Sequence, residues 1–424
     1  MQRKSLAKKS VLQFFSWLVL QSAFFPAGSL TAENQVIPET TAPFYKAEMI
    51  FPLEPWHNHA SCLVELPNGD LLICWYNGSG EQEADDVKIL GARKVKGETA
   101  WRPRFLMADT PNFPDLNPCM IIDPQKRLWL FWPVILANEF HTALMKYRIS
   151  TDCQDPDRPP QWGWNDNMLF IPENFSQQTR EAMDRYLVNK DLASVASQEF
   201  KRLREKASDK MFNRLGWMTR AHPTVLPTGR LIVPLYSDGW SFSLMAFSDD
   251  WGKTWSTSSP LVGAGNIQPS IALKKDGTLV AYMRDNGPPP KRRHVSSSSD
   301  QGLTWTPVVD TDLPNPGSGC EVINMKEGLW ALVYNDTEEG RHSLAVSISD
   351  DEGKRWKWTR HLELDPRAAR PGSFHYPSII QTRDGLLHVS YSYFLNHLPE
   401  GQPRKSIKHA AFNLAWVKEG DKDK

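Results

Sequence analysis

One eight-residue pattern, S-x-D-x-G-x-T-W, constrains the fold of this 424-residue chain more than any other feature. Its copies occupy residues 248–255, 298–305 and 349–356, with Arg355 in place of Thr in the last. A spacing of about 50 residues is typical of a repeat architecture. The pattern predicts a tight turn between two strands, because glycine readily adopts positive φ and the Ser and Asp side chains hydrogen-bond turn amides. The closing tryptophan is expected to pack into the core.

A second repeat signal supports the first. Each unit has an apolar run, a short turn such as Asn68-Gly69 or Asp276-Gly277, and a second apolar run, which is typical of a β-hairpin with two buried strands. The units are residues 59–75, 117–132, 222–236, 268–283, 320–334 and 376–391. Six hairpins with outer strands predict an all-β, six-bladed β-propeller over residues 45–417. Residues 45–51 or 407–417 would close the ring by sharing one blade between the termini. The hairpin starts then meet at one face, so we expect the functional site there.

One segment, residues 172–215, departs from the strand pattern. It is rich in Glu, Lys, Arg, Ala and Leu, and it carries apolar residues at helical spacing in 181–187 and 200–203. We therefore predict a helical insertion between blades two and three. It is either a lid or wall over the pocket or a solvated side decoration.

The ends of the chain have their own signals. Residues 1–32 predict a signal peptide, with basic residues before an apolar run at 11–25 and small residues after it. The alternative is an uncleaved membrane anchor, although the apolar run is short for a membrane span. We therefore expect an exported protein, periplasmic or secreted, without a membrane span after cleavage. Residues 418–424 form a charged C-terminal tail.

Composition excludes some functions. The formal net charge is zero, so nothing indicates a nucleic-acid partner. The odd count of five cysteines, without a CxxC pair, favours buried thiols over disulfides. The eleven histidines are scattered, so no metal site and no cofactor is predicted.

The repeated turn resembles the Asp-box, or bacterial neuraminidase repeat (BNR), of the sialidase superfamily. The resemblance covers most of residues 55–417 at the level of blades. It implies a six-bladed propeller whose Asp-boxes lie on the rim opposite the active site, so their Asp residues are structural. It also implies a glycosidase that holds a substrate carboxylate with three arginines, uses a tyrosine nucleophile helped by a glutamate, and uses an aspartate as acid and base.

Three residues match that pattern by position. Arg284 follows the blade-four hairpin as the family's second arginine does, and Arg341 precedes the last Asp-box as the third does. A guanidinium group suits a carboxylate because it binds bidentately and stays charged. Tyr376 comes 35 positions after Arg341 and resembles the nucleophile. The alternatives are structural ion pairs for the arginines and a plain repeat residue for Tyr376.

Other positions depart from the family. Asn58 stands where the first arginine is expected, and Gln268 stands near the place of the activating glutamate, where a neutral amide cannot take a proton. The acid/base aspartate should lie in the loop after Tyr76, which offers Glu81, Glu83 and Asp85 instead. A carboxyl in a half-buried pocket can have the raised pKa that an acid needs. The alternative is a solvated acidic loop.

Further candidates come from the hairpin starts. His59 and His222 begin inner strands and should face the pocket, where a neutral imidazole can act as base or acid. Each can equally be a hydrogen-bonded blade residue. Glu321 opens blade five as another carboxylate, and Arg220 would add positive charge.

Three functions fit these observations. The first is an exported sialidase-like glycoside hydrolase acting on an acidic glycan, with Tyr376 or a water as nucleophile. The second is a polysaccharide lyase that removes the C5 proton of a uronic acid with His59, His222 or Tyr376. The third is a glycan-binding propeller without catalytic activity.

Overall fold

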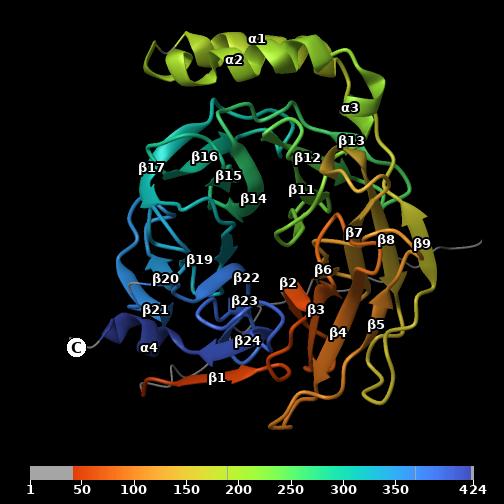
Figure 1. The fold of residues 1–424 in the computed structure, drawn as a ribbon, viewed down its shortest axis with the longest axis vertical. Helices are drawn as coiled ribbons and strands as arrows, with labels where there is room; N and C mark the ends of the chain where they lie inside the picture. Colours follow the sequence, from red (N-terminus) through yellow and green to blue (C-terminus); the bar gives the residue numbers. More distant parts are fainter. Residues whose placement is uncertain (1–41, 189, 368, 422–424) are drawn as a thin grey trace, which may run out of the picture. The chain divides into compact units, whose positions relative to one another are not determined.

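The computed structural model describes residues 42–188, 190–367 and 369–421. The described strands form six antiparallel sheets of four strands each, which confirms the predicted six-bladed β-propeller (Figure 1). The predicted signal peptide, residues 1–32, lies outside the described residues, as do residues 422–424. No helix in the described part of the chain is both long and apolar enough to cross a membrane.

The first three blades follow one another along the chain. Blade one contains β2 (His57–Glu65), β3 (Leu71–Gly78), β4 (Lys88–Lys94) and β5 (Phe105–Ala108). Blade two contains β6 (Cys119–Ile122), β7 (Leu128–Ile135), β8 (Ala143–Ser150) and β9 (Trp164–Asn167). Blade three contains β10 (Thr224–Val225), β11 (Leu231–Ser237), β12 (Phe242–Ser248) and β13 (Ser256–Thr257).

The other three blades repeat this order and close the ring. Blade four contains β14 (Asn266–Leu273), β15 (Leu279–Asp285), β16 (Arg292–Ser298) and β17 (Val309–Pro314). Blade five contains β18 (Glu321–Asn324), β19 (Trp330–Tyr334), β20 (Ser343–Ser349) and β21 (Trp358–Leu364). Blade six contains β22 (Ser373–Gln381), β23 (Leu387–Phe394), β24 (Lys405–Phe412) and β1 (Tyr45–Met49). Because β1 pairs with β24, the two ends of the propeller share one blade, as predicted.

The Asp-box turns have the predicted hydrogen bonds. In the blade-four copy, the Ser298 hydroxyl donates to Asp300 at 2.7 Å and accepts from the Gly302 amide at 2.9 Å. Asp300 also accepts from the amide of Thr304 at 2.9 Å. Gly302 has a φ of 85°, and Gln301 before it has a φ of 60°, so two successive residues are left-handed. These turns follow β12, β16 and β20, the third strands of blades three, four and five, at the end remote from the hairpin starts.

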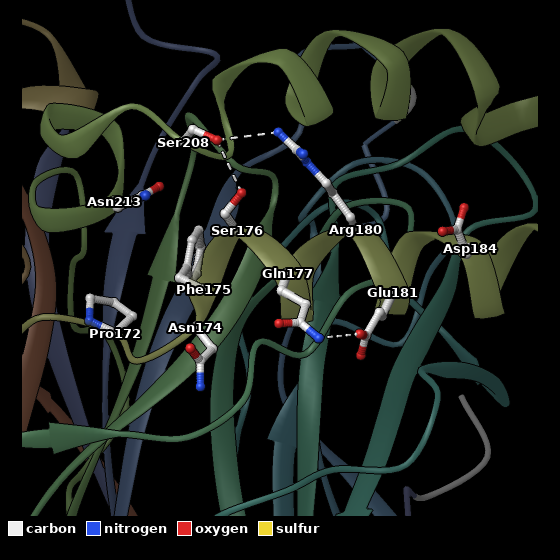
Figure 2. Close-up of a pocket in the computed structure, with 10 residues that line it drawn as sticks. All are labelled: Pro172, Asn174, Phe175, Ser176, Gln177, Arg180, Glu181, Asp184, Ser208 and Asn213. Carbon is white, nitrogen blue, oxygen red and sulfur yellow. Dashed lines mark hydrogen bonds between the residues drawn. The ribbon is translucent and has the colours of Figure 1, made fainter.

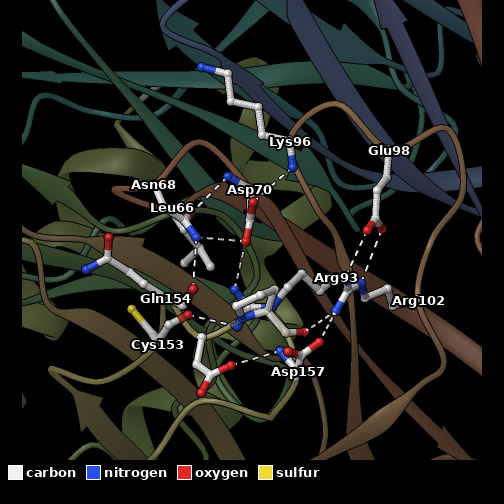
Figure 3. A network of polar contacts seen from close by, with 12 residues as sticks. Leu66, Asn68, Asp70, Arg93, Lys96, Glu98, Arg102, Cys153, Gln154 and Asp157 are labelled. Carbon is white, nitrogen blue, oxygen red and sulfur yellow. Dashed lines mark hydrogen bonds and ion pairs between the residues drawn. The ribbon is translucent and has the colours of Figure 1, made fainter.

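A buried arginine on β4 links blade one to the segment that follows blade two, and Figure 3 shows its network. Arg93 on β4 contacts Asp70, in the β2–β3 turn, at 3.1 Å, and it donates to the carbonyl of Cys153, beyond β8, at 2.8 Å. Both charged side chains are almost fully buried. Arg102 extends the network to the surface, where it pairs with Glu98 and Asp157.

Helices follow β9 and precede β10 in the chain: α1 (Phe175–Leu187), α2 (Lys190–Lys206) and α3 (Lys210–Arg214). Phe175 at the start of α1 packs on the buried Trp240 of blade three, with ring centroids 5.1 Å apart. A polar groove of about 620 Å³ runs along α1. Arg180 donates to Ser208 there at 3.2 Å, and Figure 2 shows the residues that line the groove. The remaining helices are the short η1 (Phe140–Thr142) and α4 (Leu414–Glu419).

All five cysteines are buried and free, as predicted.

Candidate functional site

A polar cavity of about 310 Å³ lies where the hairpin starts meet. Six of the residues singled out from the sequence line it. Those that line it are His59, Glu81, Gln268, Arg284, Arg341 and Tyr376. They come from blades one, four, five and six, so the ring brings together side chains that lie far apart in the sequence.

Three inner strands carry the same backbone irregularity at this cavity. The pairing register shifts after His59 on β2, after Ile267 on β14 and after His375 on β22. The residue that follows each is left-handed: Ala60 has a φ of 53°, Gln268 a φ of 55° and Tyr376 a φ of 55°. A β-bulge re-aims a side chain, and left-handed non-glycine residues cluster at functional sites. The bulges of β14 and β22 direct Gln268 and Tyr376 into the cavity.

Tyr376 is the centre of the arrangement. Its hydroxyl oxygen accepts hydrogen bonds from Arg284 Nη1 at 2.9 Å and from Gln268 Nε2 at 2.9 Å. The guanidinium carbon of Arg341 lies 5.7 Å from the centroid of its ring. That of Arg220 lies 5.0 Å away, but Arg220 is buried, donates to the Pro377 carbonyl and does not line the cavity. Three cations therefore surround one phenol, and two of them face the cavity.

Glu81 is the only one of the three loop carboxylates named from the sequence that lines this cavity. It accepts from Tyr76 at 2.8 Å and contacts His57 Nε2 at 3.0 Å. Burial by itself would raise the pKa of Glu81, but the hydrogen bond with His57 and the nearby imidazoles outweigh it and lower the pKa to about 2. Glu81 is therefore ionised. Glu83 and Asp85 are exposed, and Asp85 accepts from Asn138 at 2.8 Å.

His59 lines the cavity as a neutral imidazole. Burial, followed by the influence of His375, holds its pKa well below the usual value. Its Nδ1 contacts the Ser392 hydroxyl at 2.7 Å, and its ring stacks on Tyr376 with centroids 4.3 Å apart. Its Nε2 has no hydrogen-bond partner among the residues that the structure describes.

Three other predicted residues lie outside the cavity lining. Asn58 is fully buried, and its side-chain oxygen accepts from Trp75 at 3.0 Å and from Asn77 at 2.9 Å. His222 Nδ1 contacts Glu321 at 2.8 Å, and Glu321 also accepts from the His222 amide at 2.7 Å.

The pair formed by His222 and Glu321 ties blades together. The second oxygen of Glu321 accepts from the amide of Ile379 on β22 at 2.7 Å, and His222 Nε2 lies 2.8 Å from the Leu63 carbonyl on β2. Burial opposes both charges, but Cys62 and then Glu321 raise the pKa of His222, and His222 in turn lowers the pKa of Glu321. This geometry is that of a structural link between blades.

Sequence reasoning missed Asp238, which lines the cavity directly after β11. Burial raises the pKa of its carboxyl; Arg284 opposes this effect and Glu81 adds to it. Its carboxyl makes no hydrogen bond or ion pair with any described residue. The sequence offered one signal for Asp238, its place at the end of the second strand of a blade. Tyr76 in blade one and Arg284 in blade four lie at the corresponding place. Among the described residues, no group of three or more His, Cys, Asp or Glu side chains is placed to hold a metal ion.

The fold and the cavity together define a class: a six-bladed propeller of the sialidase superfamily, with Asp-box turns at one end and a cavity containing Tyr and Arg at the other. The chain belongs to the family of the BNR repeat-like domain, whose model matches residues 69–389.

Sequence relatives agree with this family. A sialidase of Micromonospora viridifaciens is 26% identical over 185 residues, which are 41% of this chain and 26% of that protein. Sialidase-3 of Mus musculus is 24% identical over 302 residues, which are 65% of this chain and 64% of that protein. The chain thus spans less than two thirds of these relatives. A solved leech intramolecular trans-sialidase has the same fold, with a TM-score of 0.64, 14% identity, and coverage of 88% of this chain and 71% of that one.

Proposed function

We propose that this protein is a sialidase-like glycoside hydrolase that removes an acidic sugar from the end of a glycan. The observation that carries the proposal is the Tyr376 oxygen, held by Arg284 and Gln268 in a cavity that also contains Arg341. The cavity volume of about 310 Å³ suits one sugar ring with its substituents better than a chain of sugars. The names of the relatives, sialidases in both cases, support the same substrate class.

The two cavity arginines would hold the sugar carboxylate. Arg284 keeps one nitrogen on Tyr376 and another on Asn286 at 2.9 Å, and Arg341 donates to the Gly317 carbonyl at 2.6 Å. These contacts orient the guanidinium groups before the substrate binds, which lowers the entropy cost of binding. A carboxylate placed between them would put the anomeric carbon near Tyr376, whose oxygen would stabilise the positive charge of an oxocarbenium-like transition state.

A second function, elimination from a uronic acid, is favoured by one specific observation. His59 is neutral and offers Nε2 in the cavity, while Gln268 cannot act as a base for Tyr376. A lyase needs such a base to remove the C5 proton and leaves an unsaturated sugar.

Mass spectrometry of the products from pooled sialylated and uronic-acid glycans would separate these functions. Hydrolysis adds the mass of one water across the cleaved fragments, and elimination does not. We expect water addition, lost in both Tyr376→Phe and Arg341→Ala but kept in the control Arg355→Ala, whose side chain is 83% exposed in an Asp-box turn. Unsaturated fragments would replace the hydrolase with the lyase. Binding to a glycan array without any product would make the protein a lectin.

We also propose that the protein is exported and that residues 172–215 are an insertion between blades two and three. The basic and apolar order of residues 1–32 supports the first, and α1 to α3 between β9 and β10 support the second. Secretion of a reporter fused after residue 32, absent when the apolar run is interrupted by charges, would test export.

A further inference from the structure

We infer that Asp238 is the group that protonates the leaving oxygen of the glycoside, a role that rests on the proposed hydrolase function. The resemblance to sialidases places the acid in the loop after blade one, where this chain has Glu81. The cavity contains both carboxyl groups, one from blade one and one from blade three, and they differ in what surrounds them.

The surroundings of Glu81 fix it as an anion. Tyr76 donates to Glu81 Oε1 at 2.8 Å, and His57 Nε2 lies 3.0 Å from the same atom. A carboxylate that accepts two hydrogen bonds is stabilised in its charged form. Such a group is a poor proton donor at neutral pH, because the proton is absent from it.

The surroundings of Asp238 have the opposite effect. The described residues donate no hydrogen bond to its carboxyl, although it lines a partly closed cavity. Two neighbours carry charge: Arg284, which favours the carboxylate, and the ionised Glu81, which favours the acid. Burial is the largest effect and raises the pKa of Asp238, with a smaller contribution in the same direction from Glu81 and an opposing one from Arg284. Two carboxyl groups whose environments push their pKa values apart are the usual arrangement of an acid and its anionic partner.

The backbone that carries Asp238 is held firmly from outside the cavity. Trp240, two residues on, is buried and donates through Nε1 to the Phe212 carbonyl on α3 at 2.8 Å. The Trp240 ring also packs on Phe212, at a centroid distance of 5.6 Å, and on Phe175 of α1, at 5.1 Å. A Cβ atom on Gly239 would come within 3.2 Å of the Phe212 ring, so this turn and α3 are in direct contact. The helices that follow blade two thus position the acid on blade three.

The reaction balances with Asp238 as its proton carrier. Its O–H gives a proton to the glycosidic oxygen while the bond from that oxygen to the anomeric carbon breaks, and the alcohol leaves neutral. The Tyr376 oxygen and the substrate carboxylate offset the positive charge at the anomeric carbon. The Asp238 carboxylate then takes a proton from the water that adds to this carbon. One glycoside and one water give one free sugar and one alcohol, and Asp238 is protonated again.

The test compares two leaving groups on the same acidic sugar, 4-nitrophenol and an ordinary sugar alcohol. A nitrophenolate leaves without a proton, whereas an alcohol needs one, so loss of the acid affects only the second substrate strongly. For Asp238→Asn we expect a loss in kcat/KM of about 10²–10⁴-fold on the sugar-linked substrate and less than about tenfold on the nitrophenyl substrate. Glu81→Gln should lower both rates alike. Asp312→Asn, which alters an exposed carboxyl group on β17, is the control and should leave both rates unchanged.

Each outcome decides a separate point. Equal losses on the two substrates in Asp238→Asn, or no loss, would overturn the assignment, and so would a leaving-group difference found in Glu81→Gln instead. If the unaltered protein hydrolyses neither substrate, the proposed function fails before the acid is tested. A melting temperature close to that of the unaltered protein and retained binding of the free sugar would show that Asp238→Asn is folded.

Discussion

At the scale of single residues, Gln268 is the most informative position. Its backbone is left-handed, with a φ of 55°, and its Nε2 donates to the Tyr376 oxygen at 2.9 Å. Its Oε1 is buried and has no partner among the described residues. An amide here can hold the phenol in place but cannot take its proton, so the described hydrogen-bond partners of the Tyr376 oxygen, Gln268 and Arg284, include no base.

We therefore expect Gln268→Glu to raise kcat for hydrolysis by at least about tenfold, because a carboxylate at this place can accept the phenol proton. Arg284, which also contacts the Tyr376 oxygen, would partly balance the new negative charge. Steady-state kinetics on the nitrophenyl substrate would measure the effect. Gln268→Leu, which removes the donor without adding a base, should lower kcat instead. A Glu variant no faster than the Leu variant would contradict this account of Tyr376.

At the scale of elements, the helices between β9 and β10 reach the cavity through two contacts. Phe212 on α3 stacks on His141 of η1, with centroids 5.6 Å apart, and the preceding residue, Phe140, lines the cavity. The same Phe212 packs on Trp240, in the turn that carries Asp238. The short helix α3 thus supports two parts of the cavity wall. Of the two roles considered for residues 172–215, this favours a wall of the pocket over a solvated decoration at the side.

Truncation of the Phe212 side chain should reduce activity, although Phe212 itself does not line the cavity. We expect Phe212→Ala to lower kcat/KM by about 10–100-fold, because small displacements of positioned groups are costly to the rate. Met211→Ala, a change to a neighbouring side chain that is 50% exposed, is the matched control and should have little effect. Unchanged kinetics in a folded Phe212→Ala protein would show that α3 does not position the cavity wall.

At the scale of the whole molecule, the propeller is held together by buried polar links between blades as well as by its apolar core. Arg93, which pairs with Asp70 inside blade one, donates to the Cys153 carbonyl after blade two, and His222 and Glu321 join blade three to blade five. Removing one partner of a buried ion pair leaves the other charge without compensation, which costs about 3–5 kcal/mol.

Arg93→Ala should therefore lower the free energy of unfolding by about 3–5 kcal/mol, measured by chemical denaturation, because it leaves the buried Asp70 unpaired. Arg102→Ala removes an arginine from the exposed part of the same network and should change stability little. Equal effects of the two substitutions would mean that burial of the Asp70 charge contributes nothing. The double variant Arg93→Ala/Asp70→Ala should recover part of the loss, because no charge is then left buried.

Local sequence signals were sufficient to predict the blades. The Asp-box turns and the alternation of apolar runs with glycine turns depend on contacts within a few residues, and such contacts form alike wherever the pattern occurs. The resemblance to sialidases, applied to these repeats, predicted the places of Tyr376, Arg284 and Arg341 relative to the hairpins and the last Asp-box. The structure brings these three side chains into one cavity.

The environment of each candidate could not be read from the sequence, because it depends on contacts between blades. Asn58 and Gln268 both begin inner strands, yet hydrogen bonds with Trp75 and Asn77 hold the first away from the cavity, while a left-handed backbone turns the second into it. Glu81 and Asp238 are both carboxyl groups at strand ends. Their neighbours make the difference: His57 and Tyr76 keep Glu81 an anion, whereas the half-buried Asp238 has no hydrogen-bond partner for its carboxyl among the described residues and has a raised pKa. The sequence by itself determined the ring of blades, because its turns and strands are local. Tertiary structure alone decided the chemistry of the cavity, because charge and burial there are set by residues from different blades.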